Sequence, residues 1–301
     1  MDFKNYLVPG KTGLLIGIGG VSMSPLAEVL HDAGLDIRGS DMAESSNTLT
    51  LRERGIPIHI GHSADNVTDD ISFVIRTAAV HDDNPEVHEA HRRGIPVFER
   101  TQAWGALMRG YQNALCISGT HGKTTTTSMC THIMMAAEKD PTVMIGGTLP
   151  LLKACHRVGK GNTIIMESCE YYNSFLALNP TIAVVLNIEA DHLDFFKDLE
   201  DIKHSFRCFA ERVPAETGTV IANYDDANTM DALRGIARKV ITFGLNAKAD
   251  VYAQNIVHRG SVSEFDIYHR GNYFARVTLH VPGIHNVRNA LAATAAAIVL
   301  G

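Results

Sequence analysis

Residues 119–124 (GTHGKT) have the composition of a loop that binds a nucleoside triphosphate. The apolar run at residues 114–118 predicts a strand before the loop, and a helix is expected to begin at Lys123, which is the context that such a loop requires. There, backbone N–H groups can surround a β-phosphate, the Lys123 ammonium can neutralise β- and γ-phosphate oxygens, and the Thr124 hydroxyl can ligate Mg²⁺. The leading glycine of the usual motif falls at Ile117, so the loop is a variant. The sequence therefore predicts phosphoryl-transfer chemistry at this loop.

Two acidic clusters each follow a predicted strand further along the chain. Glu167 and Glu170 come after the strand expected at residues 163–166, and residues 189–194, which include His192, come after the strand expected at residues 182–187. Because the carboxyl ends of parallel strands meet at one edge of a sheet, both clusters should lie beside the phosphate loop and could fix metal ions there. Each cluster taken alone is more often solvated loop charge.

His285 and Asn289 stand four residues apart at the start of the last predicted helix, so their side chains should share one face. Such a pair could hydrogen-bond the edge of a nucleotide base. Asn286 is equally well explained as the N-cap residue of that helix.

A second glycine-rich loop lies near the N-terminus, at residues 17–22 (GIGGVS). It stands between a predicted strand and a predicted helix, where Gly17, Gly19 and Gly20 would let the backbone approach a diphosphate at the helix N-terminus. The third position of the usual fingerprint is Ser22, and Asp41 stands at the end of the next predicted strand. The loop alone is a weak signal, because a tight turn has the same residues and because it does not distinguish NAD, FAD and a nucleotide sugar.

Parallel sheets are needed to position these loops, and the order of apolar and amphipathic segments predicts them. The first part of the chain has strands expected at residues 14–18, 36–39, 58–60, 73–75 and 97–98 and helices at 24–33, 85–92 and 101–109. The second part has the strands and helices named above, and alternating residues at 250–281 that predict a small antiparallel meander. The predicted fold is α/β: a Rossmann-like parallel-sheet domain at residues 1–112 and a P-loop α/β domain at residues 113–301.

Composition excludes several classes of protein. With 301 residues, 45% of them hydrophobic and 20% charged, the chain is not disordered, collagen-like or a coiled coil. Its net charge of -6 offers no general basic field for nucleic acid or an anionic membrane. The five cysteines form no CxxC pair, so neither a disulfide framework nor a thiolate zinc site is indicated. The polar N-terminus and short apolar runs predict no signal peptide or membrane insertion, and we expect a cytoplasmic protein.

Three segments of the second domain resemble the central domain of the Mur ligases. They are residues 119–127 (GTHGKTTTT), residues 184–192 (VVLNIEADH) after Asn179-Pro180, and residues 283–293 (GIHNVRNALAA). In the first domain, residues 17–24 (GIGGVSMS), 39–41 (GSD) and 61–64 (GHSA) are similar to family members that act on UDP-N-acetylmuramate. The resemblance covers essentially the whole chain, and its motifs are specific.

The resemblance implies a role for each domain. The N-terminal domain would bind the UDP part of the substrate, and the second domain would bind ATP and Mg²⁺. Lys123 would contact the β- and γ-phosphates, Thr124 and Glu170 would hold one Mg²⁺, and His192 would hold a second. The implied UDP-sugar residues are Gly17, Gly19, Gly20, Ser22, Ser40, Asp41 and His62; the implied ATP residues are Gly119, Thr120, His121, Gly122, Lys123, Thr124 and Thr125, with His285 and Asn289 near adenine.

The implied activity is formation of an amide between L-alanine and the lactyl carboxylate of UDP-N-acetylmuramate through an acyl phosphate, with Lys123, Glu170 and His192 as the catalytic residues. Two features depart from the family. Many members read EADESD where residues 167–172 read ESCEYY, although Glu170 keeps its place. Family members also continue with a third domain that binds the amino acid, and this sequence reaches Gly301 where that domain should start, so we expect these 301 residues to be inactive alone.

Three other readings stay open. A related ligase attaches recycled murein tripeptide to UDP-N-acetylmuramate, and the sequence hardly separates the two activities. The chain could instead be a module that binds UDP-sugar and ATP without turnover. A nicotinamide-dependent dehydrogenase rests on the first glycine loop alone, and the phosphate loop argues against it.

Overall fold

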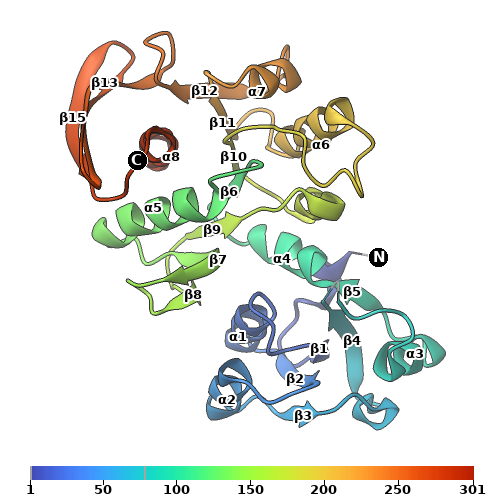
Figure 1. The fold of residues 1–301 in the computed structure, drawn as a ribbon. Helices are drawn as coiled ribbons and strands as arrows, with labels where there is room; N and C mark the ends of the chain where they lie inside the picture. The colour runs from blue at the N-terminus through green and yellow to red at the C-terminus, as the bar shows by residue number, and fades with distance from the viewer. Residues whose placement is uncertain (1, 78) are drawn as a thin grey trace. The chain divides into compact units, whose positions relative to one another are not determined.

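The computed structural model describes residues 2–77 and 79–301. The chain forms two compact units, of which the first ends at Gly110 and the second begins at Tyr111. The sequence analysis placed the division between residues 112 and 113, two residues further along the chain. Each unit is built on a mainly parallel sheet with helices packed on it (Figure 1), which confirms the predicted α/β fold.

The first unit contains a parallel sheet with the strand order β3-β2-β1-β4-β5. The chain order reverses between β1 and β4, and in such sheets ligands bind outside the carboxyl ends of the strands at this point. Strand β1 is buried along its whole length, as expected for a strand with both faces covered. The elements are β1 (Thr12–Ile16), α1 (Ser24–Asp32), β2 (Asp36–Asp41), α2 (Ser46–Glu53), β3 (Ile58–Ile60), β4 (Ile71–Arg76), α3 (Pro85–Arg92), β5 (Val97–Glu99) and α4 (Arg100–Met108), with short 3-10 helices at Phe3–Tyr6 and Ala64–Asn66.

The second unit contains a larger sheet with the order β15-β14-β13-β12-β11-β10-β6-β9-β7-β8. Strand β6, which leads into the phosphate loop, pairs in parallel with β9 on one side and β10 on the other. The strands are β6 (Asn113–Ser118), β7 (Thr142–Leu149), β8 (Ala154–Arg157), β9 (Thr163–Glu167), β10 (Ile182–Val185), β11 (Thr219–Asn223), β12 (Lys239–Gly244), β13 (Val251–Arg259), β14 (Val262–His269) and β15 (Asn272–Leu279). The helices are α5 (Lys123–Ala136), α6 (Leu199–Glu211), α7 (Ala227–Ala232) and α8 (Ile284–Leu300), with a 3-10 helix at Tyr171–Ala177.

The predicted meander is present, but it is not a separate sheet. Strands β13, β14 and β15 pair antiparallel with one another, while β13 also pairs in parallel with β12 through Phe243 and Gly244. The meander therefore extends the large sheet at one end. The alternation at residues 250–281 predicted the hairpins, whereas the long-range pairing with β12 leaves no local pattern.

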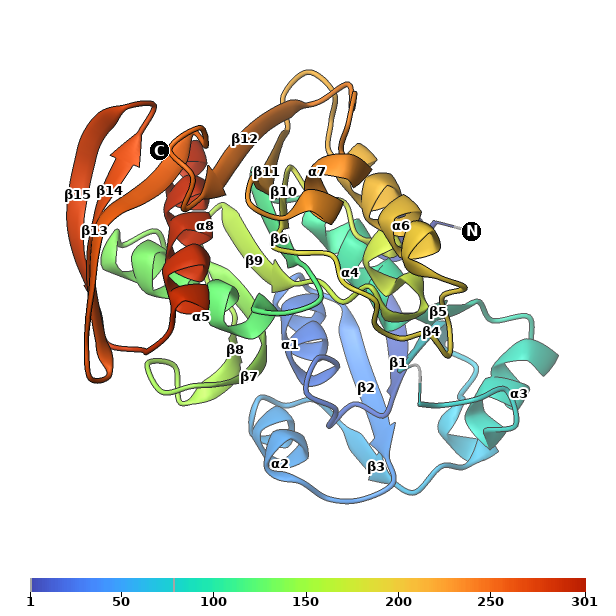
Figure 2. The ribbon, with the colours of Figure 1, turned by 45° about the horizontal axis from the view of Figure 1, so that its top comes forward.

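Helices cover both faces of the large sheet (Figure 2). Helix α8 packs on α5 and over β11, β12 and β13, and the apolar side chains between these helices and the strands form the main core of the unit. Helix α6 packs on α7 and β10. Among the described helices, none combines the length and the apolar character needed to cross a bilayer.

Two of the five cysteines are expected to resist thiol reagents until the chain unfolds. Cys116 and Cys130 are buried, and burial raises the pKa of each thiol to about 12. At pH 8 only about one thiol in 10⁴ would then be a thiolate, the reactive form. A chromogenic disulfide reagent at pH 8 should label Cys116 and Cys130 only after denaturant is added, as read by mass spectrometry. Rapid labelling of either one in the folded chain would contradict the burial that the structure gives them.

Candidate functional site

The phosphate loop joins the carboxyl end of β6 to the N-terminus of α5. Gly119 and Gly122 have φ values of +141° and +86°, which side chains rarely allow. Asn187, which follows β10, holds the loop: its Oδ1 accepts the backbone N–H of His121 at 2.8 Å, and its Nδ2 donates to the His121 carbonyl at 3.0 Å. Because the N-cap residue of α5 is glycine, no cap side chain occupies the first N–H groups of the helix. These groups carry partial positive charge and suit an anion.

Lys123 and Glu170 form a buried ion pair at the loop. Lys123 Nζ lies 3.0 Å from Glu170 Oε2, and it also donates to the carbonyls of Gly119 at 2.5 Å and Thr120 at 3.2 Å. The side chains are only 15% and 3% exposed. A buried carboxylate needs a counter-charge, and Lys123 supplies it. The structure thus brings together two of the residues that the sequence singled out.

Thr124 hydrogen-bonds the second carboxylate of this segment, Glu167. Its Oγ1 donates to Glu167 Oε1 at 3.1 Å, and the backbone N–H of Gly146 donates to Glu167 Oε2 at 2.6 Å. Hydroxyl and carboxylate oxygens are the ligands that Mg²⁺ prefers, and Mg²⁺ sites use only one or two carboxylates together with waters and phosphates. Thr124, Glu167 and Glu170 therefore fit this ion. Within residues 2–77 and 79–301, no group of three or more His, Cys, Asp or Glu side chains could hold a metal alone.

His192 lies in the loop after β10 and belongs to an aromatic cluster. Its ring stacks on Tyr171 with centroids 4.3 Å apart, and its φ is +53°. Tyr171 in turn donates its hydroxyl to Asp194 at 2.5 Å, and this hydrogen bond raises the pKa of the phenol above its usual value. Of the interactions found in the described part of the chain, none links His192 to Lys123, Thr124 or Glu170. A metal-binding role for His192 stays a prediction.

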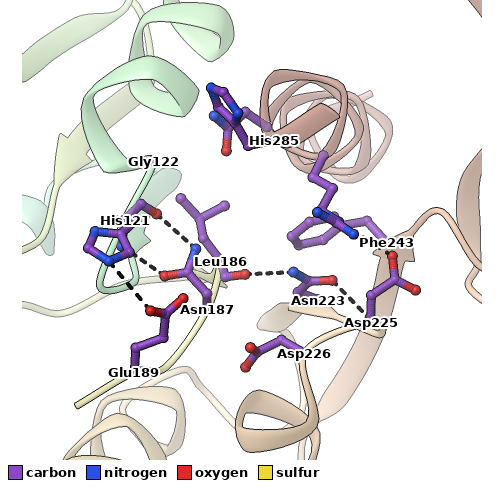
Figure 3. Close-up of a pocket in the computed structure, with 12 residues that line it drawn as sticks. His121, Gly122, Leu186, Asn187, Glu189, Asn223, Asp225, Asp226, Phe243 and His285 are labelled. Carbon is purple, nitrogen blue, oxygen red and sulfur yellow. Dashed lines mark hydrogen bonds and ion pairs between the residues drawn. The ribbon is translucent and has the colours of Figure 1, made fainter. Parts of the chain in front are cut away.

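A pocket of about 390 Å³ lies beside the phosphate loop (Figure 3). The exposed imidazole of His121 lies 3.6 Å from Glu189, and Asn223 Nδ2 donates to the Leu186 carbonyl at 2.8 Å. Polar side chains thus surround a concave space next to residues that suit phosphates. The lining residues are His121, Gly122, Leu186, Asn187, Glu189, Asn223, Asp225, Asp226, Phe243, His285, Arg288 and Asn289.

His285 and Asn289 both line this pocket from the first turns of α8. His285 is exposed, whereas Asn289 is 7% exposed, and a Cβ at Gly122 would lie 2.6 Å from its Oδ1. The interpretation of Asn286 as an N-cap residue was wrong, because the N-cap is Gly283. Asn286 instead donates to the Pro282 carbonyl at 2.6 Å and accepts from Asn289 Nδ2 at 3.1 Å. Asn286 thereby fixes the amide of Asn289.

The remaining loop residues lie close to these groups. Thr120 accepts the backbone N–H of Glu189 through its Oγ1 at 2.9 Å, which ties the loop to the segment after β10. Thr125 follows in the first turn of α5 and is half-buried.

Sequence reasoning missed one side of the pocket. Asn223 ends β11 and Asp225 follows it, and β11 pairs in parallel with β10. Because parallel strands end at the same edge of a sheet, a prediction of β11 would have placed both residues beside the phosphate loop. Asp225 Oδ2 accepts the backbone N–H of Leu245 at 2.6 Å and lies 3.7 Å from Arg288 Nε. Arg288 lies between His285 and Asn289 in α8, and it lines the same pocket.

Asp41 hydrogen-bonds the glycine loop of the first unit. The Asp41 carboxylate accepts the backbone N–H of Gly19 at 2.8 Å, and the Gly20 N–H donates to the Gly17 carbonyl at 3.1 Å. Gly17 has a φ of +77°, so the chain turns there as β1 ends. The Ser22 carbonyl accepts from Trp104 Nε1 at 3.2 Å. Ser40, next to Asp41, is buried, and its Oγ lies 3.2 Å from His62 Nδ1.

The fold and this site define an α/β protein with a P-loop nucleotide-binding unit. Comparison with known proteins gives the family: residues 15–112 match the Mur ligase family, catalytic domain, and residues 117–297 match the Mur ligase middle domain. The chain belongs to the Mur ligase family.

Individual relatives and structures agree with this. The chain is 46% identical to the UDP-N-acetylmuramate--L-alanine ligase of Agathobacter rectalis and 45% identical to that of Caldicellulosiruptor saccharolyticus, in each case over 95% of this chain. It spans 62% and 63% of the length of these two relatives. Its structure is similar to UDP-N-acetylmuramate-alanine ligase MurC from Thermotoga maritima, with a TM-score of 0.79 and 31% identity over 96% of this chain and 65% of that one. It is also similar to the UDP-N-acetylmuramate:L-alanyl-gamma-D-glutamyl-meso-diaminopimelate ligase from Neisseria meningitides, with a TM-score of 0.85 and 26% identity over 97% of this chain and 94% of that one.

Proposed function

We propose that this chain carries the UDP-sugar-binding and ATP-binding parts of a cytoplasmic ligase that joins L-alanine to the lactyl carboxylate of UDP-N-acetylmuramate. The observation that carries the proposal is the ion pair of Lys123 and Glu170 at a glycine loop on the N-terminus of α5. The names of the relatives that are 45% and 46% identical supply the substrates.

The chemistry explains why such a site suits this reaction. A carboxylate is a poor electrophile, so an amine does not condense with it at neutral pH. Transfer of the γ-phosphoryl group of ATP to the carboxylate breaks the bond between the β-γ bridging oxygen and the γ-phosphorus and gives an acyl phosphate and ADP. The amine nitrogen then attacks the acyl carbon, phosphate leaves, and the amine loses a proton. Catalysis by this route depends on positioning and charge stabilisation and needs no covalent enzyme nucleophile.

The residues of the phosphate loop would divide this work. The backbone N–H groups of residues 119–124 and the N-terminus of α5 would bind phosphate oxygens, and Lys123 would offset the negative charge that two anionic substrates bring together. Thr124, Glu167 and Glu170 would hold Mg²⁺, which supplies further charge neutralisation when bound. The pocket lined by His285 and Asn289 would take the base of ATP, and the glycine loop closed by Asp41 would take the UDP part of the sugar nucleotide.

Binding measurements on the chain test the proposal directly. Calorimetry should show binding of ATP and of UDP-N-acetylmuramate, and removal of Mg²⁺ with a chelator should weaken ATP binding while leaving UDP binding unchanged. NAD should not bind. Binding of NAD with no binding of the UDP-sugar would favour the dehydrogenase instead. If the full product of the gene binds both nucleotides but releases no phosphate with any amine, the chain serves binding without turnover.

A second candidate is favoured by the TM-score of 0.85 to the ligase from Neisseria meningitides, whose name specifies a tripeptide as the amine. The two activities share the nucleotide and differ only in the amine. A panel of amines with the full gene product separates them: phosphate release with L-alanine supports the first proposal, and release only with the tripeptide supports the second.

A further inference from the structure

Glu86, in the first turn of α3, is a fully buried carboxylate that the site described above does not use. It is 0% exposed and bonds three side chains: Ser40 Oγ donates to its Oε2 at 2.7 Å, Asn66 Nδ2 donates to its Oε1 at 2.6 Å, and His62 Nδ1 lies 2.9 Å from Oε2. These partners come from β2, from the segment after β3 and from the 3-10 helix at Ala64–Asn66. None of these three partners is a lysine or an arginine.

This arrangement decides which nitrogen of His62 carries a proton. An ionised carboxylate only accepts hydrogen bonds, so the nitrogen that faces Glu86 must donate. Ser40 Oγ and Asn66 Nδ2 both donate to Glu86, one to each carboxylate oxygen, so both oxygens act as acceptors. His62 is therefore held with its proton on Nδ1, because the network assigns it there.

The same bonds leave Nε2 of His62 for a ligand. The side chain of His62 is 14% exposed, and no hydrogen bond from Nε2 occurs among the described residues. Ser40, the second partner of Glu86, adjoins Asp41, whose carboxylate closes the glycine loop. Glu86, His62 and the glycine loop are thus linked at the carboxyl end of β2.

We propose that Glu86 is a positioning residue for the UDP-sugar: by accepting a hydrogen bond from Nδ1–H of His62 it fixes the orientation of the imidazole ring, so that Nε2 can hydrogen-bond the nucleotide. This proposal rests on the proposed function, in which the first unit binds UDP. Removing the acceptor at residue 86 releases the ring to rotate and to take the other tautomer, and the ligand then loses a fixed partner.

The test measures UDP binding by calorimetry for wild type, Glu86→Met, Glu86→Gln, His62→Ala and the double variant Glu86→Met/His62→Ala. Glu86→Met removes the acceptor at similar size and should weaken UDP binding about tenfold. Glu86→Gln keeps one acceptor oxygen and should recover most of that loss. In the His62→Ala background Glu86→Met should cause no further loss, because Glu86 acts through His62.

A matched control lies on the same helix. Glu89 bonds Arg92 and Arg93 and not His62, so Glu89→Met perturbs α3 without touching the network and should leave UDP binding unchanged. The ¹⁵N shifts of His62 in the folded variants give a reading that does not depend on the ligand. They should show a proton on Nδ1 in wild type and a shift toward Nε2–H in Glu86→Met.

The outcomes distinguish a failure of the proposed function from a failure of the role proposed for Glu86. If wild type does not bind UDP, the proposed function is wrong for this unit. If wild type binds UDP but His62 carries its proton on Nε2, or if the losses from Glu86→Met and His62→Ala add, Glu86 does not position His62.

Discussion

Replacing Lys123 with alanine should abolish ATP-dependent ligation by the full gene product and should also destabilise the second unit. The rate should fall about 10³-fold or more, because the ammonium is the cation of the loop that can stabilise charge developing on the transferred phosphoryl group. Removing it also leaves Glu170, whose side chain is 3% exposed, without its counter-charge. Breaking a buried pair in this way costs about 3–5 kcal/mol. Phosphate release and a urea unfolding curve measure the two effects.

The double variant Lys123→Ala/Glu170→Gln separates catalysis from stability. Neutralising Glu170 removes the unpaired charge, so most of the lost free energy of unfolding should return. ATP binding and ligation should not return, because the double variant lacks the ammonium and has also lost the Glu170 carboxylate that would hold Mg²⁺. A folded Lys123→Ala variant that ligates at the wild-type rate would disprove the proposed role. Recovery of ligation in the double variant would show that Lys123 serves stability alone.

The parts of this site that are local in sequence could be predicted, and those set by distant contacts could not. Residues 119–124 contain their own signal, and the rule that parallel strands end at one edge led to Glu167 and Glu170. The backbone N–H of Gly146, in β7, donates to Glu167 and thereby orients its carboxylate toward the Thr124 hydroxyl. Strand β7 contains two adjacent glycines that interrupt its apolar pattern, so neither the strand nor this contact was predicted.

Asn223 and Asp225, which line the pocket, were also not predicted, because the strand that carries them was not recognised. Strand β11 is a short buried run, TVIAN, and β12 is another, KVITFG; each is too short for periodicity to distinguish it from a helix segment. Without β11, Asn223 and Asp225 had no assigned place. In the first unit, Ser40, Asp41 and His62 were chosen from motifs, but Glu86 stands in a helix far along the chain, and its buried charge is visible only once β2 and α3 are placed.

Replacing Gly119 with alanine should disrupt the phosphate loop. Gly119 has a φ of +141°, which is nearly restricted to glycine, and strain of this kind costs about 1–3 kcal/mol. The new Cβ would also lie 2.8 Å from Leu186 Cβ and 3.2 Å from the backbone nitrogens of Leu186 and Asn187. Since backbone atoms cannot move aside as a side chain can, overpacking adds about 1–3 kcal/mol. The loop must shift away from β10.

That shift should remove the alignment of the loop N–H groups, and ATP affinity should fall at least tenfold, which corresponds to about 1.4 kcal/mol. Calorimetry with ATP measures the loss, and a urea unfolding curve of the same variant shows whether the second unit is folded. Gly147→Ala is the matched control: its Cβ would meet Thr124 Cγ2 at 3.5 Å, an ordinary contact, and its φ is not positive. Wild-type ATP affinity in Gly119→Ala would mean that the position of this loop does not determine nucleotide binding. An equal loss in Gly147→Ala would mean that any added bulk near Thr124 has the same effect.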